Sequence, residues 1–316
     1  MTASTDNTAR PLLIPRLQWN RQAREDIAGY LFISPWLIGF IIFTVGPFIA
    51  SFIFSLFNTN LINKFEFVGL GNYVELLKNE IWWKSLYNTC FLAFFGLATG
   101  IPLGLAIALL LNEQVAGLKI FRTTFYLPSV VAGVAVFLIW ITIFDYNYGL
   151  LNSFVEALGL PPQRWLTSSE WVKPSMVLMS WWGVGGGVIL YLAGLQAIPK
   201  ELYEAAELDG AARPQRFRRI TLPMLSPTIF FMLITGIIGS LQTFVGPLVM
   251  TGGGPNYAST TVVLWLYYNG FRYFKMGYAS AMAWVLFFII AMFSALVFRS
   301  SSAWVYYEGE ILGKRG

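Results

Sequence analysis

The segment from Pro199 to Pro223 reads PKELYEAAELDGAARPQRFRRITLP. It holds nine charged residues in 25, whereas only 12% of the whole chain is charged. Apolar runs long enough to cross a bilayer flank it on both sides. Because one charge at the bilayer centre costs roughly 2.5–3.5 kcal/mol on insertion scales, nine of them cannot lie there. The segment is therefore predicted to stand in water between two membrane spans.

The composition of the whole chain indicates a membrane protein without enzymatic groups. Its 316 residues are 56% hydrophobic, and soluble domains carry about 25% charged residues, roughly twice the share found here. The chain has no histidine and one cysteine, Cys90. Triads that use histidine as a base and zinc sites that use imidazole are thus excluded. We expect no catalytic residue, no metal, no cofactor and no nucleic-acid partner.

Six apolar segments reach the length of about twenty residues that a spanning helix needs. All 37 charged residues (21 Lys and Arg, 16 Asp and Glu) lie outside them. The sequence therefore predicts an all-α, polytopic membrane protein with six transmembrane helices. The expected spans are Leu31–Phe57, Leu86–Leu111, Phe125–Phe144, Pro174–Ile198, Thr228–Met250 and Met276–Phe298.

The distribution of basic residues predicts the orientation. With the N-terminus inside, the inner segments carry fourteen Lys and Arg and the outer loops carry seven, which favours cytoplasmic N- and C-termini. The first run is too long for a signal peptide and lacks a small-residue cleavage site, so we interpret it as a retained span. The expected parts are an N-terminal segment (1–30), a six-span domain (31–298) and a C-terminal tail (299–316). The stretch Arg10–Arg24 either lies along the membrane surface or is disordered.

Glycine patterns in two spans leave alternatives open. Gly96, Gly100 and Gly104 recur at every fourth position, a spacing that allows close helix approach. The stripe indicates either packing within this chain or a subunit interface. In the fourth span, four of the five residues 183–187 are glycine, which weakens a helix by about 1 kcal/mol per glycine. That region either lines a wet cavity or packs closely.

The segment 199–223, called the elbow below, is predicted to form two short helices. Pro199 suits a first helical position, and the acidic side chains of Glu201 and Glu204 favour the positive end of a helix. Gly210, after Asp209, ends this helix because glycine adopts the left-handed conformation without a clash.

The second helix of the elbow is expected to start at Pro214, and Pro223 and Pro227 are expected to stop it before the fifth span. An ordinary solvated loop would explain the arginines of the elbow but not its ordered caps. Apolar residues among the acids indicate an exposed face that docks a partner; they are Leu202, Ala205, Ala206 and Leu208.

The elbow resembles the EAA loop of permeases from binding-protein-dependent ABC importers. Glu204-Ala205-Ala206 is followed by Asp209-Gly210, nine residues, and Ile220-Thr221-Leu222-Pro223. Other stretches look like the sugar-uptake branch, the maltose- and lactose-type permeases. These are Phe67–Tyr73, Asn88-Thr89, Phe121-Arg122 with Leu127-Pro128, Thr251–Pro255 and Gly277–Ala281.

The resemblance implies a fold, a location and partners. It implies a MetI-like permease fold in the cytoplasmic (inner) membrane and a carbohydrate as the transported substrate. It also implies a second permease subunit forming a heterodimer, two ATP-binding subunits and an extracytoplasmic solute-binding protein. The elbow would couple to the ATPase. Glu204 would make a polar contact, Ala205 and Ala206 would pack in a cleft, and Gly210, after Asp209, would form the bend.

The resemblance also suggests a substrate path between the fourth and fifth spans. The residues aligned with it are Trp181, Trp182, Gly183, Gly186, Gly239, Ser240, Gln242 and Thr243. Helix packing is the alternative role for each. Met179 and Gly186 stand where maltose-type permeases have polar or aromatic residues, and Ser240 and Thr243 replace amides, so maltose itself is disfavoured and the particular sugar or polyol stays open.

The loop Thr251–Pro255 is glycine-rich but does not match a phosphate-binding loop. That motif needs G-x-x-x-x-G-K-[ST], and the only lysine followed by Ser or Thr is Lys84. We expect the loop to stop a helix beside the surface where an external binding protein docks, and ATP hydrolysis to reside on a separate subunit. An ion-gradient-driven transporter and an intramembrane enzyme are the rival classes. Both are disfavoured by the absence of carboxylates and histidines within the spans.

Overall fold

The computed structural model describes residues 21–113, 117–131 and 133–306, and these form two compact units, 1–51 and 52–316. The first unit contains α1 (Arg21–Phe40), the π-helical turn η1 (Ile41–Val45) and the first part of α2 (Gly46–Ser55). The interfacial segment expected around Arg10–Arg24 lies largely outside the described residues, and helix α1 begins at Arg21.

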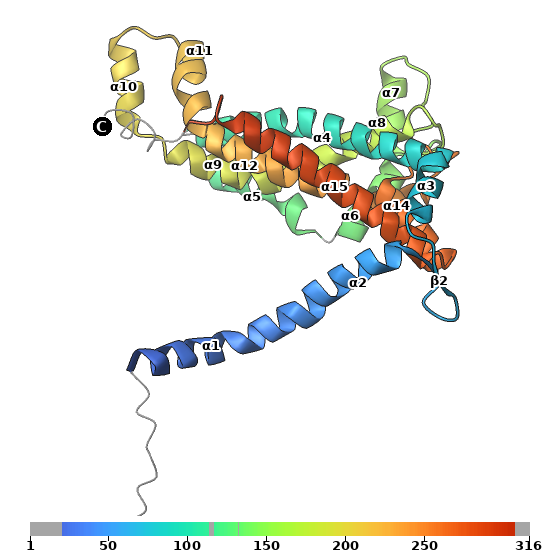
Figure 1. The fold of residues 1–316 in the computed structure, drawn as a ribbon. Coiled ribbons are helices and arrows are strands. Elements are labelled where there is room, and N and C mark those ends of the chain that lie inside the picture. The colour runs from blue at the N-terminus through green and yellow to red at the C-terminus, as the bar shows by residue number, and fades with distance from the viewer. Residues whose placement is uncertain (1–20, 114–116, 132, 307–316) are drawn as a thin grey trace, which may run out of the picture. The chain divides into compact units, whose positions relative to one another are not determined.

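The second unit is a helical bundle with a short hairpin (Figure 1). Its strands β1 (Phe57–Thr59) and β2 (Phe65–Phe67) pair antiparallel, with Phe57 opposite Phe67. The long helices are α4 (Glu80–Asn112), α12 (Leu222–Leu241) and α15 (Met276–Ser301). The remaining helices are α3 (Gly71–Lys78), α5 (Leu118–Val130), α6 (Gly133–Ile143), α7 (Leu150–Ala157), α8 (Val172–Ser180), η2 (Trp181–Val184), α9 (Gly185–Gln196), α10 (Lys200–Leu208), α11 (Arg213–Arg216), η3 (Phe217–Thr221), α13 (Val245–Thr251), α14 (Val262–Tyr267) and η4 (Tyr268–Arg272).

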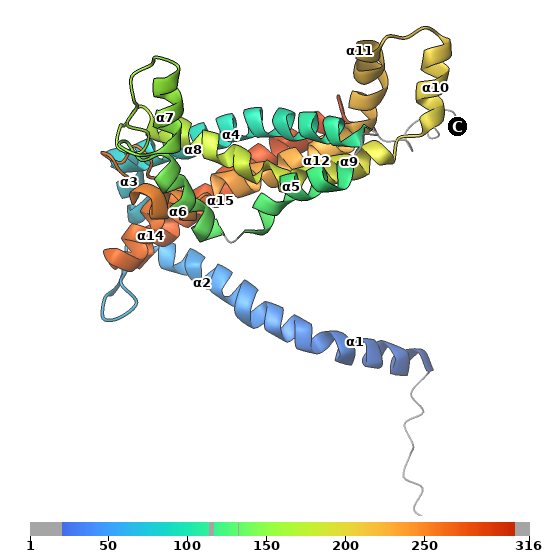
Figure 2. The ribbon, with the colours of Figure 1, turned by 180° about the vertical axis from the view of Figure 1, so that it is seen from behind.

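Helix α4 is the centre of the bundle, because it packs along both α9 and α12, while α15 covers the other side of α12. Figure 2 shows α5 beside α9 on the face opposite α15. One buried cluster lies near the elbow and includes Ala108, Tyr191 and Leu225. A second lies at the other end of the bundle and includes Trp82, Leu264 and Met282. The bundle therefore has a packed core near each end.

The structure has five or six of the six expected spans, with some different boundaries. Among the described residues, five helices are long and apolar enough to cross a membrane: Glu25–Ser55, Glu80–Asn112, Val172–Gln196, Arg213–Leu241 and Met276–Ser301. The expected third span is instead a pair of helices, 120–129 and 133–143, bent by 97°. If this bent pair is one span, the total is six.

The fifth span also differs from the prediction. Helix α12 ends at Leu241, and α13 begins at Val245 as a separate helix. The expected continuous span Thr228–Met250 is therefore wrong at this point. The Thr243 carbonyl left over at the break accepts a hydrogen bond from the Thr261 hydroxyl at 2.7 Å, so this backbone group of the break has a partner within the bundle.

Within the two glycine patterns, Gly104 and Gly185 make close contacts within this chain, whereas Gly96, Gly100 and Gly183 line a cavity described below. A Cβ added to Gly104 would lie 2.9 Å from Val184 Cγ1, so the stripe on α4 packs against the fourth span. A Cβ added to Gly185 would lie only 2.0 Å from the Phe125 carbonyl oxygen. Helix α9 can approach the backbone of α5 this closely only at a residue without a side chain.

Stretches that the resemblance singled out far apart in the sequence meet at the end of the bundle opposite the elbow. The Asn88 amide donates to the carbonyls of Tyr257 (2.8 Å) and Thr260 (2.9 Å). The Thr89 hydroxyl accepts from the Val262 backbone amide at 2.9 Å. Helix α13 stops at Thr251, and Gly252 follows in the left-handed conformation (φ 59°), as the glycine-rich loop predicted. Asn88 and Thr89 of α4 thus hold the loop that follows α13.

Candidate functional site

The first helix of the elbow, α10, has a well-formed C-terminus. Asp209 is its C-cap, and Gly210 follows with φ +73°. The Gly210 amide donates to the Glu207 carbonyl at 3.0 Å, and the Ala211 amide to the Ala206 carbonyl at 2.8 Å. This pair of bonds is the Schellman arrangement, which requires a left-handed residue at the position of Gly210. Gly210 therefore has the left-handed backbone that the predicted bend requires.

The N-terminus of α10 differs slightly from the prediction. Pro199 is the N-cap with ψ 133°, and the helix begins at Lys200. Glu201 lies in the first turn, where its carboxylate faces the positive end of the helix. The proline thus ends the short turn that follows α9 and does not open the helix itself.

The second helix of the elbow does not stop before the fifth span, contrary to the prediction from Pro223 and Pro227. Helix α11 continues through η3 into α12, so that Arg213–Leu241 is one run of 29 helical residues. The Leu222 amide bonds to the Phe217 carbonyl, five residues back. This widened turn ends at Thr221, two residues before Pro223, where an ordinary α-helical turn would clash with the proline ring. The helix therefore passes the proline without breaking.

Side-chain contacts fix the elbow to the bundle. The hydroxyls of Tyr203 and Thr221 are hydrogen-bonded at 2.9 Å, which joins α10 to η3. Arg216 pairs with Glu207 across the bend. Tyr203, Phe217 and Ile220 pack against the buried cluster at this end of the bundle. The elbow is thus attached to α12 at several points and stands out from the end of the bundle (Figure 1).

The outward side of α10 is open. Leu208 is 91% exposed and Leu202 is 42% exposed. Glu204, Ala205 and Asp209 are exposed, and Ala206 is half-buried. The apolar face predicted between the acids is present on the surface of this unit. Such a surface is typical of a docking site.

A cavity of about 400 Å³ lies where the fourth and fifth spans are irregular. On one side the helix tightens to a 3₁₀ turn over Trp181–Val184, and on the other the backbone breaks between α12 and α13. Among the predicted path residues, Gly183, Ser240 and Thr243 line this cavity. Irregular backbone at membrane depth is tolerated where it lines a cavity, and both irregular stretches do so here.

The other predicted path residues lie around the cavity but do not line it. The Trp181 indole donates to the Thr99 hydroxyl at 2.8 Å, and the Trp182 ring meets the Trp140 ring edge-on, with centroids 6.1 Å apart. Gly186 lies beside Ser129. The Gln242 amide donates to the Ile238 carbonyl of its own helix at 2.9 Å, and the space where a Cβ of Gly239 would stand is open.

Sequence reasoning missed part of the cavity wall. Phe137 of the bent pair and Gly246 and Pro247 of α13 line it, together with Gly96 and Gly100 of α4. The dipeptide Gly246-Pro247 was the available signal, because it marks a helix start inside an apolar run. No group of three metal-ligating side chains occurs among the residues that the structure describes.

The chain belongs to the family of binding-protein-dependent transport system inner membrane components, whose pattern matches residues 100–304. It is 40% identical over 300 residues to the probable ABC transporter permease protein YesP of Bacillus subtilis, covering 92% of this chain and 96% of that protein. It is 35% identical over 290 residues to the arabinooligosaccharides transport system permease protein AraP of the same organism, covering 90% and 91%.

A solved structure has the same fold. It is the crystal structure of a bacterial ABC transporter involved in the import of the acidic polysaccharide alginate. One chain of it superposes with a TM-score of 0.78 at 26% identity, covering 89% of this chain and 97% of that one. The bacterial alginate transporter has also been solved in complex with an alginate pentasaccharide-bound periplasmic protein. This chain is thus a membrane-spanning transport component with the permease fold.

Proposed function

We propose that this chain is the permease subunit of an ATP-driven ABC importer that translocates a carbohydrate delivered by an extracytoplasmic binding protein. The similarity to a permease for arabinooligosaccharides and to an alginate importer supports a carbohydrate substrate. A second permease subunit would form a heterodimer with this chain, and two separate ATP-binding subunits would supply the energy. Both termini would lie in the cytoplasm, as the basic residues indicate.

The observation that carries this proposal is the continuous helix from Arg213 to Leu241. Its first turns belong to the elbow, and its last turn brings Ser240 to the central cavity. At 1.5 Å per residue, 29 residues extend for about 43 Å, which is enough to cross the bilayer. One rigid element would therefore connect the docking surface for an ATPase with the space through which a solute passes.

The elbow residues have complementary roles in this proposal. Leu202, Ala205 and Ala206 would fill an apolar cleft on the ATP-binding subunit, and the acids Glu204 and Asp209 would make polar contacts at its rim. When the ATP-binding subunits close, the force enters α10 and passes to η3 through the Tyr203–Thr221 bond and the Arg216–Glu207 pair. Movement of α12 then changes the shape of the cavity at its other end.

The cavity chemistry fits a neutral, hydroxyl-rich solute. Ser240 and Thr243 offer hydroxyl groups, and the Phe137 ring and Met179 offer apolar surface; sugars present hydroxyls and one apolar ring face. Few polar groups line the space, which suits passage better than tight retention. Trp181, Trp182, Gly186, Gly239 and Gln242 would act around this path by holding the walls in place.

The proposal is tested by measuring uptake of labelled oligosaccharides in cells that express the transporter with its partners. Uptake should stop when ATP is depleted and continue when an ionophore abolishes the membrane potential. The opposite pattern would favour the rival reading, a secondary transporter driven by an ion gradient. Deletion of the binding-protein gene should abolish uptake at low substrate concentration.

A further inference from the structure

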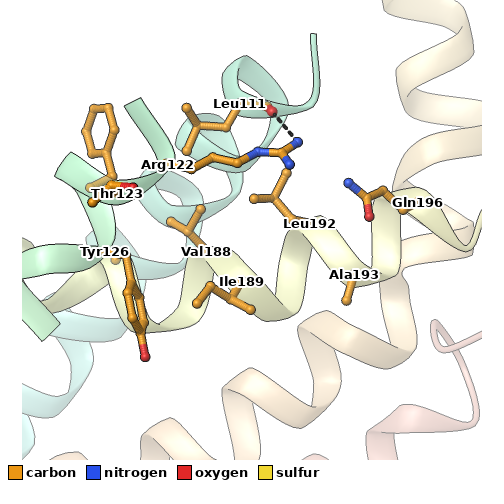
Figure 3. Close-up of a pocket in the computed structure, with 11 residues that line it drawn as sticks. Leu111, Arg122, Thr123, Tyr126, Val188, Ile189, Leu192, Ala193 and Gln196 are labelled. Carbon is orange, nitrogen blue, oxygen red and sulfur yellow. Dashed lines mark hydrogen bonds between the residues drawn. The ribbon is translucent and has the colours of Figure 1, made fainter. Parts of the chain in front are cut away.

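A second cavity, of about 440 Å³, lies between α5 and α9 at the elbow end of the bundle. Figure 3 shows Arg122 of α5 lying over Leu192 of α9, with a hydrogen bond to the Leu111 carbonyl at the end of α4. This cavity shares no lining residue with the central cavity near Ser240 and Thr243. It therefore needs an explanation of its own.

The Arg122 guanidinium is the charged group of this cavity, and its charge is uncompensated. Its hydrogen bond to the Leu111 carbonyl is 3.1 Å long, and its Nε–H is buried without an acceptor. Within the described part of the chain no carboxylate forms an ion pair with it. A buried donor without a partner is destabilising, and more so on a charged group. The site therefore favours an anion.

The rest of the cavity wall is divided by polarity. Thr123 and Gln196 lie with Arg122, and Phe125, Val188 and Ile189 form an apolar wall. The polar part lies close to the ends of α4 and α9, because Arg122 is bonded to Leu111, the residue before the last of α4, and Gln196 is the last residue of α9. These helix ends face the same side as the elbow (Figure 2), so in a bilayer crossed by the bundle the arginine would lie near the head groups of the elbow-side leaflet and the apolar wall toward the membrane interior.

We propose that this cavity binds an anionic phospholipid of the leaflet on the elbow side. Its phosphate would accept hydrogen bonds from the Arg122 guanidinium and Gln196, and one acyl chain would lie along Val188 and Ile189. Basic pockets between transmembrane helices at this depth are the sites where anionic head groups bind. An apolar wall beside the arginine favours a lipid over a free phosphate ion, which would leave that wall exposed to water.

The test uses the assembled transporter, purified in detergent, stripped of lipid and titrated with phosphatidylglycerol, with bound lipid counted by native mass spectrometry. Arg122→Gln should weaken phosphatidylglycerol binding roughly fivefold, as expected for one basic residue at a membrane surface. Arg122→Lys should retain most of the binding. Arg299→Gln, which removes a basic residue at the end of α15, is the matched control and should bind like the unaltered transporter.

Two further measurements separate the alternatives. Phosphatidylcholine should bind equally to all variants, and millimolar inorganic phosphate should not displace phosphatidylglycerol; displacement would assign the site to a free anion and overturn the lipid proposal. If Arg122→Gln does not assemble, Ala193→Phe, which fills the cavity and keeps the arginine, should lose the bound lipid. The proposal would also be overturned if assembled Arg122→Gln or assembled Ala193→Phe bound phosphatidylglycerol as well as the unaltered transporter.

Discussion

Among single residues, Gly210 determines the bend of the elbow. Its φ of +73° lies in a region that costs residues with a Cβ atom about 1–2 kcal/mol. No neighbour would touch an added Cβ within 4 Å, so the requirement comes from the backbone and not from crowding. The dipeptide Asp209-Gly210 was sufficient to predict this bend from the sequence.

We predict that Gly210→Val leaves the protein in the membrane but lowers uptake at least tenfold. The strained bend would misdirect α11 relative to α10, so that the elbow no longer fits its partner. Ala212→Val is the matched control, because Ala212 has an extended backbone (ψ 155°) that valine adopts readily. Membrane content by immunoblot and uptake by labelled substrate measure the two effects. Normal uptake in Gly210→Val cells would contradict this role.

Thr243 tests the central cavity at the same scale. We predict that Thr243→Val, which removes a hydroxyl with little change in shape, raises the KM for the cargo roughly two- to tenfold, the range expected for one hydrogen bond. Trp181→Phe should have a smaller effect, because that indole bonds to Thr99 and does not line the cavity. A KM unchanged in Thr243→Val and raised in Trp181→Phe would move the path away from the cavity.

The division between residues that line the cavity and residues that support it could not be predicted from the sequence. Motif alignment marks positions along a helix, whereas the direction of a side chain depends on the local helix type. The 3₁₀ turn at Trp181–Val184 has three residues per turn, which rotates Trp181 and Trp182 relative to an α-helix. Gly183 consequently lines the cavity, and the two tryptophans contact neighbouring helices.

Among the elements, the continuous helix Arg213–Leu241 differs most from the prediction made from the sequence. Pro223 and Pro227 predict an end of the helix, since proline removes a backbone donor and clashes with the preceding turn. The structure avoids the clash with a π-helical turn that ends at Thr221, two residues before Pro223. A similar turn precedes Pro47, where η1 ends at Val45 and the Gly46 amide bonds to the Ile41 carbonyl. Pro102 of α4 is accommodated without such a turn, so a proline in an apolar run does not by itself predict one.

We predict that softening this helix uncouples ATP hydrolysis from transport. Replacing Phe231 and Thr235, both exposed residues of α12, with glycine costs about 1 kcal/mol per site relative to alanine, so locally opened forms become roughly thirtyfold more frequent. The double glycine variant should retain ATP hydrolysis but lose most of its stimulation by loaded binding protein. The double alanine variant removes the same side chains and should remain coupled. Equal coupling in both variants would show that α12 need not be rigid.

At the scale of the whole molecule, the arrangement of charge predicted the fold class well. The separation of 37 charged residues from six apolar segments follows from the cost of burying charge in lipid, which dominates all local preferences. The bend of 97° in the third span could not be predicted, because the expected span Phe125–Phe144 holds no charged residue that would mark a turn. Tertiary contacts such as those of Phe137 with the cavity wall decide where such a segment turns.

The central claim is that the exposed face of α10 docks on a nucleotide-hydrolysing subunit. We would place the photoreactive residue benzoylphenylalanine in place of Leu208, which is 91% exposed, irradiate intact cells and identify the conjugates by mass spectrometry. The same residue in place of Phe231, which is exposed on α12, is the control. We predict a conjugate with an ATP-binding subunit from position 208 and none from position 231. Assembled transporter that gives no such conjugate from position 208 would contradict the account.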